Sequence, residues 1–347
     1  MKLLVKTPRG LERIVASRLA ELLPSTSTVI SRPKGYLGLV LVETTELTPE
    51  RILNELPEIE KLFVIEEEVP ADLERICEAS VRVAERCIRR GESFAVRTTR
   101  RGRHGFTSID VNVRAGACIQ GSLGNPVDLS YPDKIIWVEI INDRAYIACT
   151  RGDVEHKKKY PGKPDIKSLL EKIVVVQMPY LGDIKGARNM GIRIGRAAQT
   201  FGIKALYISP YYRVDAFELK EFIAGVEEGI RSRLTIQERT GHLREVKPVP
   251  VFLQDLYQFV RDHKDEGIIV TSTRGKALRE VSDKLRKIFE EKEKVNVLIG
   301  SREGIPTGVF RFADLIIDVA PGITLATDVA FSSIITALIW CLLQKEE

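Results

Sequence analysis

The feature that most constrains the fold is a series of short, continuous apolar runs in the second half of the chain. Five runs have the length of a strand and no polar alternation: residues 173–177 (IVVVQ), 205–209 (ALYIS), 267–271 (GIIVT), 295–300 (VNVLIG) and 315–319 (LIIDV). Such runs are typical of strands that are covered on both faces. Helical patterns lie between them, as over residues 187–201 and 276–290. This alternation predicts an α/β domain with a parallel sheet over residues 169–347.

The first half of the chain predicts two smaller α+β domains. Residues 1–65 favour a ferredoxin-like half-sheet, with strands at 2–6, 35–43 and 62–66, a helix over 11–22 and a second helix after its N-cap Thr48. In residues 66–155 we expect a helix over 73–87, a strand at 94–98, a helix over 107–120 and a hairpin of 135–141 with 145–149. Residues 156–168 are basic and punctuated by proline and glycine, which predicts an exposed linker. Residues 210–262 give no interpretable pattern.

Composition excludes several classes of protein. Hydrophobic residues make up 44% and charged residues 29%, which is a globular balance. The uncharged stretch from Val329 to Leu343 is shorter than the roughly 20 residues of a membrane span, so we expect a buried helix and no membrane. The five cysteines are scattered and the four histidines lack metal-ligand spacing. We therefore expect neither a disulfide framework nor a metal site, and a reducing cytoplasmic location.

A basic cluster stands out against the net charge of +5. Eight arginines lie between Arg86 and Arg114, against only Glu92 and Asp110. Arginine favours planar, bidentate contacts to phosphate, so the cluster predicts RNA binding, although a solvated basic face is the alternative. No stacked aromatic platform accompanies it, which disfavours unspecific single-strand binding. The candidate RNA-binding residues are Arg97, Arg100, Arg101, Arg103, His104, Lys157, Lys158 and Lys159.

Three motifs in this part of the chain resemble a THUMP domain. They are FAVRTTRRGRHGFTSID at 94–110, VDLSYPD at 127–133 and the hairpin that ends in TRG at 150–152. The resemblance covers roughly residues 1–155, because the family places a ferredoxin-like unit before the domain. It implies tRNA binding, usually by capture of the acceptor 3′ end.

The motifs of other enzymes that carry THUMP domains are missing from the sequence. There is no S-G-G-x-D-S pyrophosphatase loop and no H-x-E or P-C-x-x-C deaminase pattern. The acidic-Pro-Pro-aromatic motif of Rossmann-type methyltransferases and the G-x-x-x-x-G-K-[ST] phosphate loop are also absent. A thiouridine synthase, a deaminase, that methyltransferase class and an NTPase are therefore disfavoured.

Three loops of the C-terminal half remain as candidates, because open α/β sheets bind ligands at the carboxyl ends of their strands. The first is NMGIRIGRAAQTFG at 189–202, where Asn189 and Gly191 predict a turn into a helix. The second is IGSREGIP at 299–306, and the third is DVAPGITLATD at 318–328. Taken singly, each loop has an ordinary explanation. The arginines of the first can be solvated, the second can be a simple turn, and Asp328 of the third can be a helix N-cap.

Together and in this order, the three loops resemble the SPOUT methyltransferases, whose deep trefoil knot binds S-adenosylmethionine. The resemblance implies that Arg196, Asn189 and Glu303 are catalytic. It implies cofactor binding, largely through backbone groups, by Ile299, Gly300, Ser301, Gly304, Val319, Ala320, Gly322, Ile323, Leu325 and Thr327. It also implies a homodimer through the SPOUT domain.

The segment RAAQTFG at 196–202 resembles the first motif of the ribose 2′-O-methylating branch. The hypothesis is therefore an S-adenosylmethionine-dependent tRNA methyltransferase that acts on a ribose in or near the acceptor stem, with the THUMP domain holding the 3′ end. Asn189 lies one residue further from Arg196 than in that branch, and Thr324-Leu325-Ala326 replaces its Ser-Leu-Asn run. A base methyltransferase that uses Glu303 or Asp328, a non-catalytic RNA-binding protein and action on ribosomal RNA stay open as alternatives.

Overall fold

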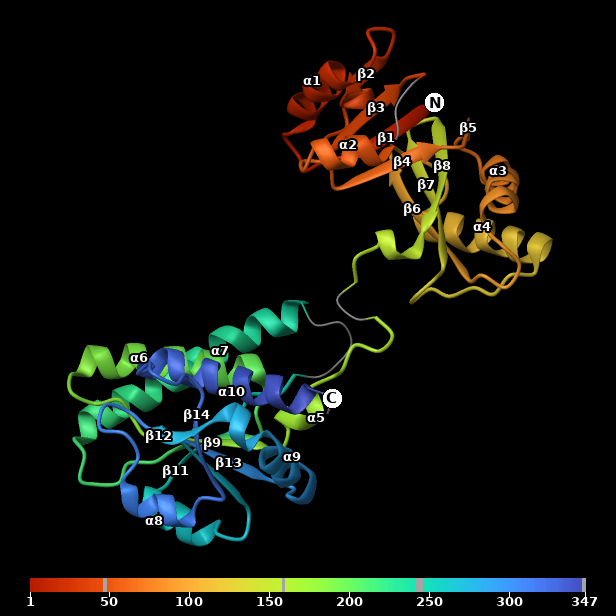
Figure 1. Ribbon diagram of the computed structural model, residues 1–347. Coiled ribbons are helices and arrows are strands. Elements are labelled where there is room, and N and C mark those ends of the chain that lie inside the picture. The colour runs from red at the N-terminus through yellow and green to blue at the C-terminus, as the bar shows by residue number, and fades with distance from the viewer. Residues whose placement is uncertain (46–48, 158–159, 241–245, 345–347) are drawn as a thin grey trace. The chain divides into compact units, whose positions relative to one another are not determined.

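The computed structural model describes residues 1–45, 49–157, 160–240 and 246–344. The chain forms two compact units, Met1–Lys163 and Pro164–Glu347 (Figure 1). The predicted N-cap Thr48 and the candidate RNA contacts Lys158 and Lys159 lie outside the described residues.

The first unit begins with an antiparallel sheet of four strands in the order β2-β3-β1-β4. Its elements are β1 (Lys2–Lys6), α1 (Glu12–Leu22), β2 (Thr28–Ser31), β3 (Leu39–Glu43), α2 (Pro49–Glu55) and β4 (Lys61–Ile65). The strand expected over 35–43 is shorter than predicted, because a 3₁₀ turn at Pro33–Gly35 precedes it. The short strand β2 was not predicted, since only two of its four residues are apolar.

The second sheet of this unit has the order β5-β8-β7-β6. Its elements are β5 (Glu67–Pro70), α3 (Leu73–Cys87), β6 (Phe94–Arg101), α4 (Ser108–Leu123), β7 (Lys134–Ile141) and β8 (Arg144–Arg151). The predicted helices and hairpin are present. Thr107 and Asp110 form a capping box at the start of α4, which fixes where this helix begins. Asn142 turns the hairpin with a φ of 53°.

The two sheets of the first unit pack against each other through their inner faces. Phe63 of β4 and Trp137 of β7 meet there, with ring centroids 5.0 Å apart. Glu139, whose side chain is 1% exposed, forms ion pairs with Lys6 of β1 and Arg101 of β6. A buried carboxylate needs charged partners. The Lys6 pair therefore links the first sheet to the second, whereas the Arg101 pair joins two strands of the second sheet.

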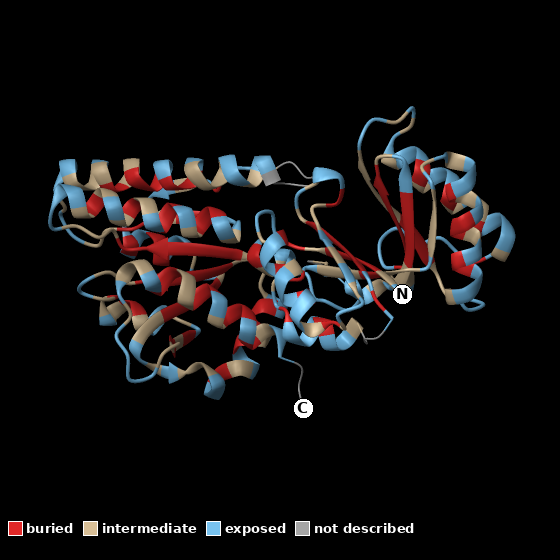
Figure 2. Cartoon of the chain, turned by 90° about the horizontal axis from the view of Figure 1, so that it is seen from above, coloured by how far each residue is buried: buried red, intermediate tan, exposed pale blue. Residues whose placement is uncertain are grey.

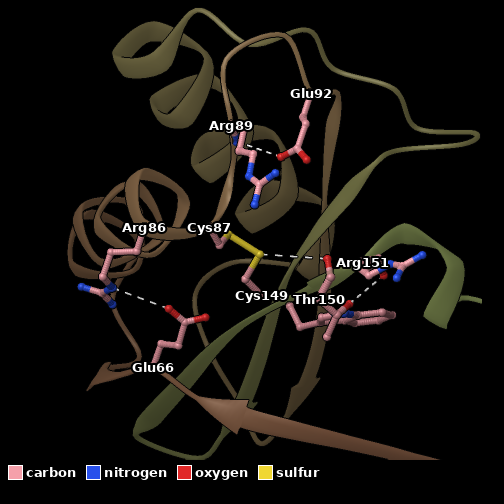
Figure 3. Close-up of a disulfide and its surroundings, with 9 residues drawn as sticks. Glu66, Arg86, Cys87, Arg89, Glu92, Cys149, Thr150 and Arg151 are labelled. Carbon is pink, nitrogen blue, oxygen red and sulfur yellow. Dashed lines mark hydrogen bonds and ion pairs between the residues drawn. A yellow bond between two sulfur atoms is a disulfide. The ribbon is translucent and has the colours of Figure 1, made fainter.

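Two disulfides cross-link the second sheet and its helices, which corrects the prediction that the cysteines form no disulfides. Cys77 of α3 is bonded to Cys118 of α4, and Cys87 at the end of α3 is bonded to Cys149 of β8 (Figure 3). The Cα atoms of the two pairs lie 6.1 and 6.6 Å apart, within the range that a disulfide spans. Cys341 is the free cysteine.

The disulfides predict the thiol count of the purified protein. Denatured without reductant, the chain should expose one reactive thiol, that of Cys341, and five after reduction. Reduction should also destabilise the first unit, by about 2–5 kcal/mol for each disulfide. Titration with a thiol reagent in denaturant measures the count. Five reactive thiols before reduction would contradict the cross-links.

The second unit is built on a six-stranded sheet in the order β11-β10-β9-β13-β12-β14, with parallel pairing throughout. Its strands are β9 (Ile173–Gln177), β10 (Ala205–Ile208), β11 (Val251–Leu253), β12 (Gly267–Ala277), β13 (Val295–Ile299) and β14 (Leu315–Asp318). The five predicted strands and the parallel sheet are present. β11, which was not predicted, adds the sixth strand.

Helices cover both faces of this sheet (Figures 1 and 2). One face is covered by α6 (Ile184–Phe201), α7 (Ala216–Thr240), α9 (Ser282–Glu291) and α10 (Thr327–Leu343). The other is covered by α8 (Leu256–Asp262) and the 3₁₀ segment Thr307–Phe312, while the short helix α5 (Lys167–Leu170) precedes β9. Both faces of the strands are thus buried, which explains their unbroken apolar runs.

Two features of this unit differ from the predictions. The helix expected over 276–290 begins only at Ser282, because β12 continues to Ala277 after a register shift between Thr271 and Lys276. The turn expected at Asn189 and Gly191 lies inside α6, which begins at Ile184. In the described part of the chain, no helix is long and apolar enough to cross a membrane.

Helices α6 and α7 contact each other backbone to backbone through glycines. A Cβ atom on Gly195 of α6 would lie 2.1 Å from the carbonyl oxygen of Val226, and one on Gly229 of α7 would lie 2.2 Å from that of Ile192. Gly191 and Gly225 are enclosed in the same way. The two helices therefore pack as one rigid pair.

Candidate active site at the carboxyl edge of the parallel sheet

Two pockets lie at the carboxyl edge of the parallel sheet. The larger, about 310 Å³, is formed by the second part of β12, by the segments that follow β13 and β14, and by the first turns of α10. The smaller, about 100 Å³, is formed by the segments that follow β9, β10 and β13. Ser301, Arg302 and Glu303 line both pockets, so the loop after β13 separates two neighbouring cavities.

The larger pocket gathers most of the residues that the family resemblance assigns to the cofactor. Seven of the ten predicted cofactor-binding residues line it: Ile299, Gly300, Ser301, Gly304, Val319, Ile323 and Leu325. The other three lie nearby in the chain without lining the pocket. Ala320 donates its N–H to Asp318 over 3.0 Å, Gly322 has a φ of 85°, and Thr327 begins α10.

One wall of the larger pocket comes from residues that the sequence analysis missed. Thr271, Ser272, Thr273 and Arg274 lie on the part of β12 that follows its apolar run. Gly275 allows this segment to reach β14, because a Cβ there would lie 2.5 Å from the carbonyl carbon of Ile317. The only sequence signal for this wall is the close succession of Gly275 and small polar residues.

The predicted catalytic residue Glu303 lies between the two pockets and bonds to a tyrosine. The Tyr211 hydroxyl donates a hydrogen bond to Glu303 Oε2 over 2.5 Å. This bond raises the pKa of Tyr211 to about 12, so the phenol stays protonated at neutral pH. Tyr211 follows β10 in the stretch that the sequence left without interpretation. A Pro-Tyr-Tyr sequence directly after a strand was the available signal.

The neighbouring residues of this loop are also arranged around the pockets. Arg302 lies 4.7 Å from the ring centre of Tyr180 and donates to the carbonyl oxygen of Leu181 over 3.2 Å. The hydroxyl oxygen of Ser301 is buried and has no hydrogen-bond partner among the described residues. Buried polar atoms are normally hydrogen-bonded. The unpaired Ser301 hydroxyl therefore indicates that the pocket accepts a ligand with a polar group.

The other two predicted catalytic residues lie outside both pockets. Asn189 and Arg196 are exposed on α6. Arg196 donates to the Ser232 hydroxyl of α7 over 2.6 Å, and Arg193 forms an ion pair with Asp328 of α10. Within one chain, therefore, the structure brings Glu303 to the cofactor candidates and does not bring Asn189 or Arg196.

In the first unit, the predicted RNA-binding residues form two groups. The first group surrounds Glu155, which pairs with Arg97 at 3.3 Å and with Lys157 at 3.1 Å. Lys157 also lies over the ring of Tyr131, beside a pocket of about 390 Å³ that Tyr131, His156 and Tyr160 help to line. Lys157 is thus half-buried instead of part of an exposed linker.

The second group is the turn after β6. Arg100 donates to Nδ1 of His104 over 3.1 Å, and the ring's other nitrogen contacts the carbonyl oxygen of Asn142 at 2.5 Å. An arginine can only donate, so Nδ1 of His104 is the acceptor in its contact with Arg100. Arg101 is paired with Glu139. Arg103 is exposed and makes no ion pair with any described residue.

Glu155 and the basic turn lie near opposite ends of one sheet. β6 runs parallel to β7, and the basic turn follows Arg101, which pairs with Ile141 at the far end of β7. The Glu155 group lies near the beginning of β7 and the end of β8, where Arg151 pairs with Lys134. Arg97 lies between the two ends, opposite Trp137 in the middle of β7, so the Glu155 group extends from its end of the sheet toward the basic turn.

Comparison with known proteins matches both units. A family model described as "AF2226-like SPOUT RNA Methylase fused to THUMP" matches residues 167–347, and the THUMP domain model matches residues 70–150. The uncharacterized protein MJ0421 of Methanocaldococcus jannaschii is 41% identical over 340 residues, covering 97% of this chain and 93% of that protein. A probable tRNA sulfurtransferase of Methanosarcina acetivorans is 31% identical over 146 residues, 39% of this chain and 34% of that protein.

Among solved structures, a putative methyltransferase of Legionella pneumophila, Lpg2936, was determined with its cofactor SAM bound. It is 15% identical, covers 72% of this chain and 97% of that chain, and has a TM-score of 0.35. A TM-score this low carries no argument, so the family assignment rests on the sequence matches alone.

The parallel α/β unit with its loops at the carboxyl edge is that of a SPOUT RNA methylase. The chain belongs to the AF2226-like SPOUT RNA methylases fused to THUMP, which confirms the family predicted from the sequence. The SPOUT methyltransferase family uses S-adenosylmethionine.

Proposed function

We propose that the protein is an S-adenosylmethionine-dependent tRNA methyltransferase that methylates a ribose 2′-hydroxyl in or near the acceptor stem. The observation that carries the proposal is the larger pocket, where seven predicted cofactor residues from two separate loops meet. Within this proposal the N-terminal ferredoxin-like domain covers residues 1–65, the THUMP domain 66–155, a linker 156–168, and a SPOUT domain with a trefoil knot 169–347. The strand order β2-β3-β1-β4 supports the first of these assignments.

The larger pocket fits S-adenosylmethionine in its chemistry. Apolar walls at Ile299, Ile305 and Leu325 suit the adenine ring, and the unpartnered Ser301 hydroxyl and nearby backbone groups offer polar contacts. When bound, the cofactor supplies an electrophilic methyl group. The protein's part is to position the nucleophile and to stabilise the charge that develops on it.

Arg196 is the residue proposed to act on the ribose hydroxyl. Because arginine stays protonated, it acts by lowering the pKa of the hydroxyl and stabilising the alkoxide, and not as a general base. Arg196 lies outside the pockets of its own chain. We therefore propose a homodimer through the SPOUT domain, in which Arg196 serves the partner's site. The exposed apolar residues Val329 and Trp340 of α10 support such an interface.

Base methylation is the second candidate, because it calls for a carboxylate near the reacting atom. The two carboxylates named for that role already have partners: Asp328 pairs with Arg193 and Glu303 accepts from Tyr211. These contacts favour the ribose. A non-catalytic RNA-binding protein is the third candidate, and ribosomal RNA is the alternative substrate.

For the first unit we propose that the THUMP domain holds the tRNA 3′ end, in a cytoplasmic enzyme. The tRNA sulfurtransferase matches support a tRNA partner. The pocket beside Lys157 offers a cation and two tyrosine rings to an unpaired strand, and Arg103 offers a cation to the backbone. No cluster of three metal-ligating side chains occurs among the residues that the structure describes.

Cofactor binding is tested by Gly300→Ala. A Cβ on Gly300 would lie 2.9 Å from the Cα atom of Gly304, so the turn between β13 and the pocket would have to open. We expect the Kd for S-adenosylmethionine to rise about five- to hundredfold by calorimetry, in line with the roughly 1–3 kcal/mol cost of overpacking. Gly308→Ala is the control, because nothing lies within 4 Å of its Cβ. Equal affinities in both variants would place the cofactor elsewhere.

Methyl transfer is tested by incubating the protein with unmodified tRNA transcripts and methyl-labelled cofactor, followed by nucleoside mass spectrometry. We expect a ribose-methylated nucleoside. Arg196→Ala should lower kcat by about 10²–10³-fold, as for loss of an oxyanion-stabilising donor, and leave the cofactor Kd unchanged. A methylated base would refute the ribose assignment, and a missing product with every tRNA would favour the RNA-binding alternative.

RNA binding by the turn after β6 is tested by Arg103→Ala. Since Arg103 has no ion-pair partner in the described part of the chain, its loss should affect RNA and not stability. We expect weaker tRNA binding and a drop of about 1 in the slope of log K against log salt concentration. Arg13→Ala, an exposed arginine of α1, is the control. An unchanged slope would make the turn a solvated basic surface.

A further inference from the structure

The smaller pocket has no role in the function proposed so far. It is lined by apolar residues of the segments after β9 and β10, including Met178, Pro179 and Pro210, and by the rings of Tyr211 and Tyr212. We propose that this pocket holds the base of the nucleotide that is methylated, against Tyr212 and with Arg302 and Glu303 at the polar edge of the base. This inference rests on the proposed function.

The position of the pocket is the first argument. It shares Ser301, Arg302 and Glu303 with the larger pocket. A ligand in the smaller pocket therefore lies directly across one loop from a ligand in the larger one. Because methyl transfer needs the nucleophile about 3–3.5 Å from the methyl group, the target nucleotide has to occupy a neighbouring site of this kind.

The shape and chemistry of the walls are the second argument. Tyr211 and Tyr212 contact each other edge to face, with ring centroids 4.6 Å apart, and the Tyr211 hydroxyl is fixed by Glu303. Tyr212 is 54% exposed. A tyrosine ring that its neighbour holds in place and that is open to solvent offers a surface on which a base can stack.

The polar side of the pocket is the third argument. Arg302 uses one N–H group to bond to Leu181, which leaves four further donors. Glu303 accepts from Tyr211 through Oε2, and its Oε1 has no partner among the described residues. A donor group beside an acceptor group complements the edge of a nucleobase, which carries both.

A base can reach this pocket only when it is unstacked. The proposal therefore requires a target nucleotide that is unpaired or is flipped out of the stem, at a cost of a few kcal/mol. Tyr212 is then a residue that selects and positions the target, and it takes no part in the chemistry.

The test is a cycle of two changes measured by tRNA affinity with S-adenosylhomocysteine present. One change is Tyr212→Ala, and the other removes the base at the methylated nucleotide but keeps its ribose. Each change alone should weaken binding by about five- to hundredfold, and together they should weaken it no more than removal of the base alone. Phe252→Ala is the matched control, because Phe252 is an exposed aromatic residue of β11 outside both pockets.

Two further measurements separate this inference from the function on which it rests. The cofactor Kd of Tyr212→Ala should stay within twofold of the wild-type value, and Tyr212→Trp should restore tRNA binding. If Tyr212→Ala weakens the binding of intact and abasic tRNA equally, or weakens neither, the base pocket is refuted. Methyl transfer by the wild-type protein is unaffected by that outcome. If the wild-type protein methylates no tRNA, the base pocket is tested by titrating the protein with the four nucleoside monophosphates. Binding that is lost in Tyr212→Ala supports the pocket. Absence of binding refutes it.

Discussion

The site depends on the parallel alignment of five strands, β9, β10, β12, β13 and β14, at one edge of the sheet. β13 lies between β9 and β12, and Ile299 at its end pairs with Gln177 at the end of β9. On the other side, Thr271 of β12 pairs with Ile317 of β14. The chain leaves the sheet at that edge after β9, β10, β13 and β14, while β12 continues past it, and these segments form the two pockets. Because the strands are buried on both faces, the carboxyl edge is where this layer can present a ligand site.

The sequence predicted the strands because burial on both faces leaves an unbroken apolar run. It also predicted that the segments after β13 and β14 would meet, as they do around Gly300 and Val319. It could not predict that β12 continues, since the residues after Thr271 are polar and pair with β14 only after a shift in register. The contribution of Tyr211 was equally hidden, because its partner Glu303 is 92 residues away in the chain.

The remaining misassignments have the same physical origin, which is that local pattern does not encode tertiary partners. Cys77 and Cys118 give no spacing motif, because α3 and α4 bring them together only when they pack. Gly191 looks like a turn residue, but it lies inside α6, where it makes room for the backbone of α7.

The shared loop after β13 has a thermodynamic consequence. Ser301, Arg302 and Glu303 belong to both pockets. If the larger pocket binds the cofactor and the smaller one the base, as proposed above, a movement of this loop changes both binding free energies at once. Linkage then requires reciprocity: the factor by which one ligand changes the affinity of the other is the same in both directions. On that assignment, a change from methyl donor to demethylated product on one side of the loop would be communicated to the nucleic acid on the other. Three consecutive residues would then couple turnover to release.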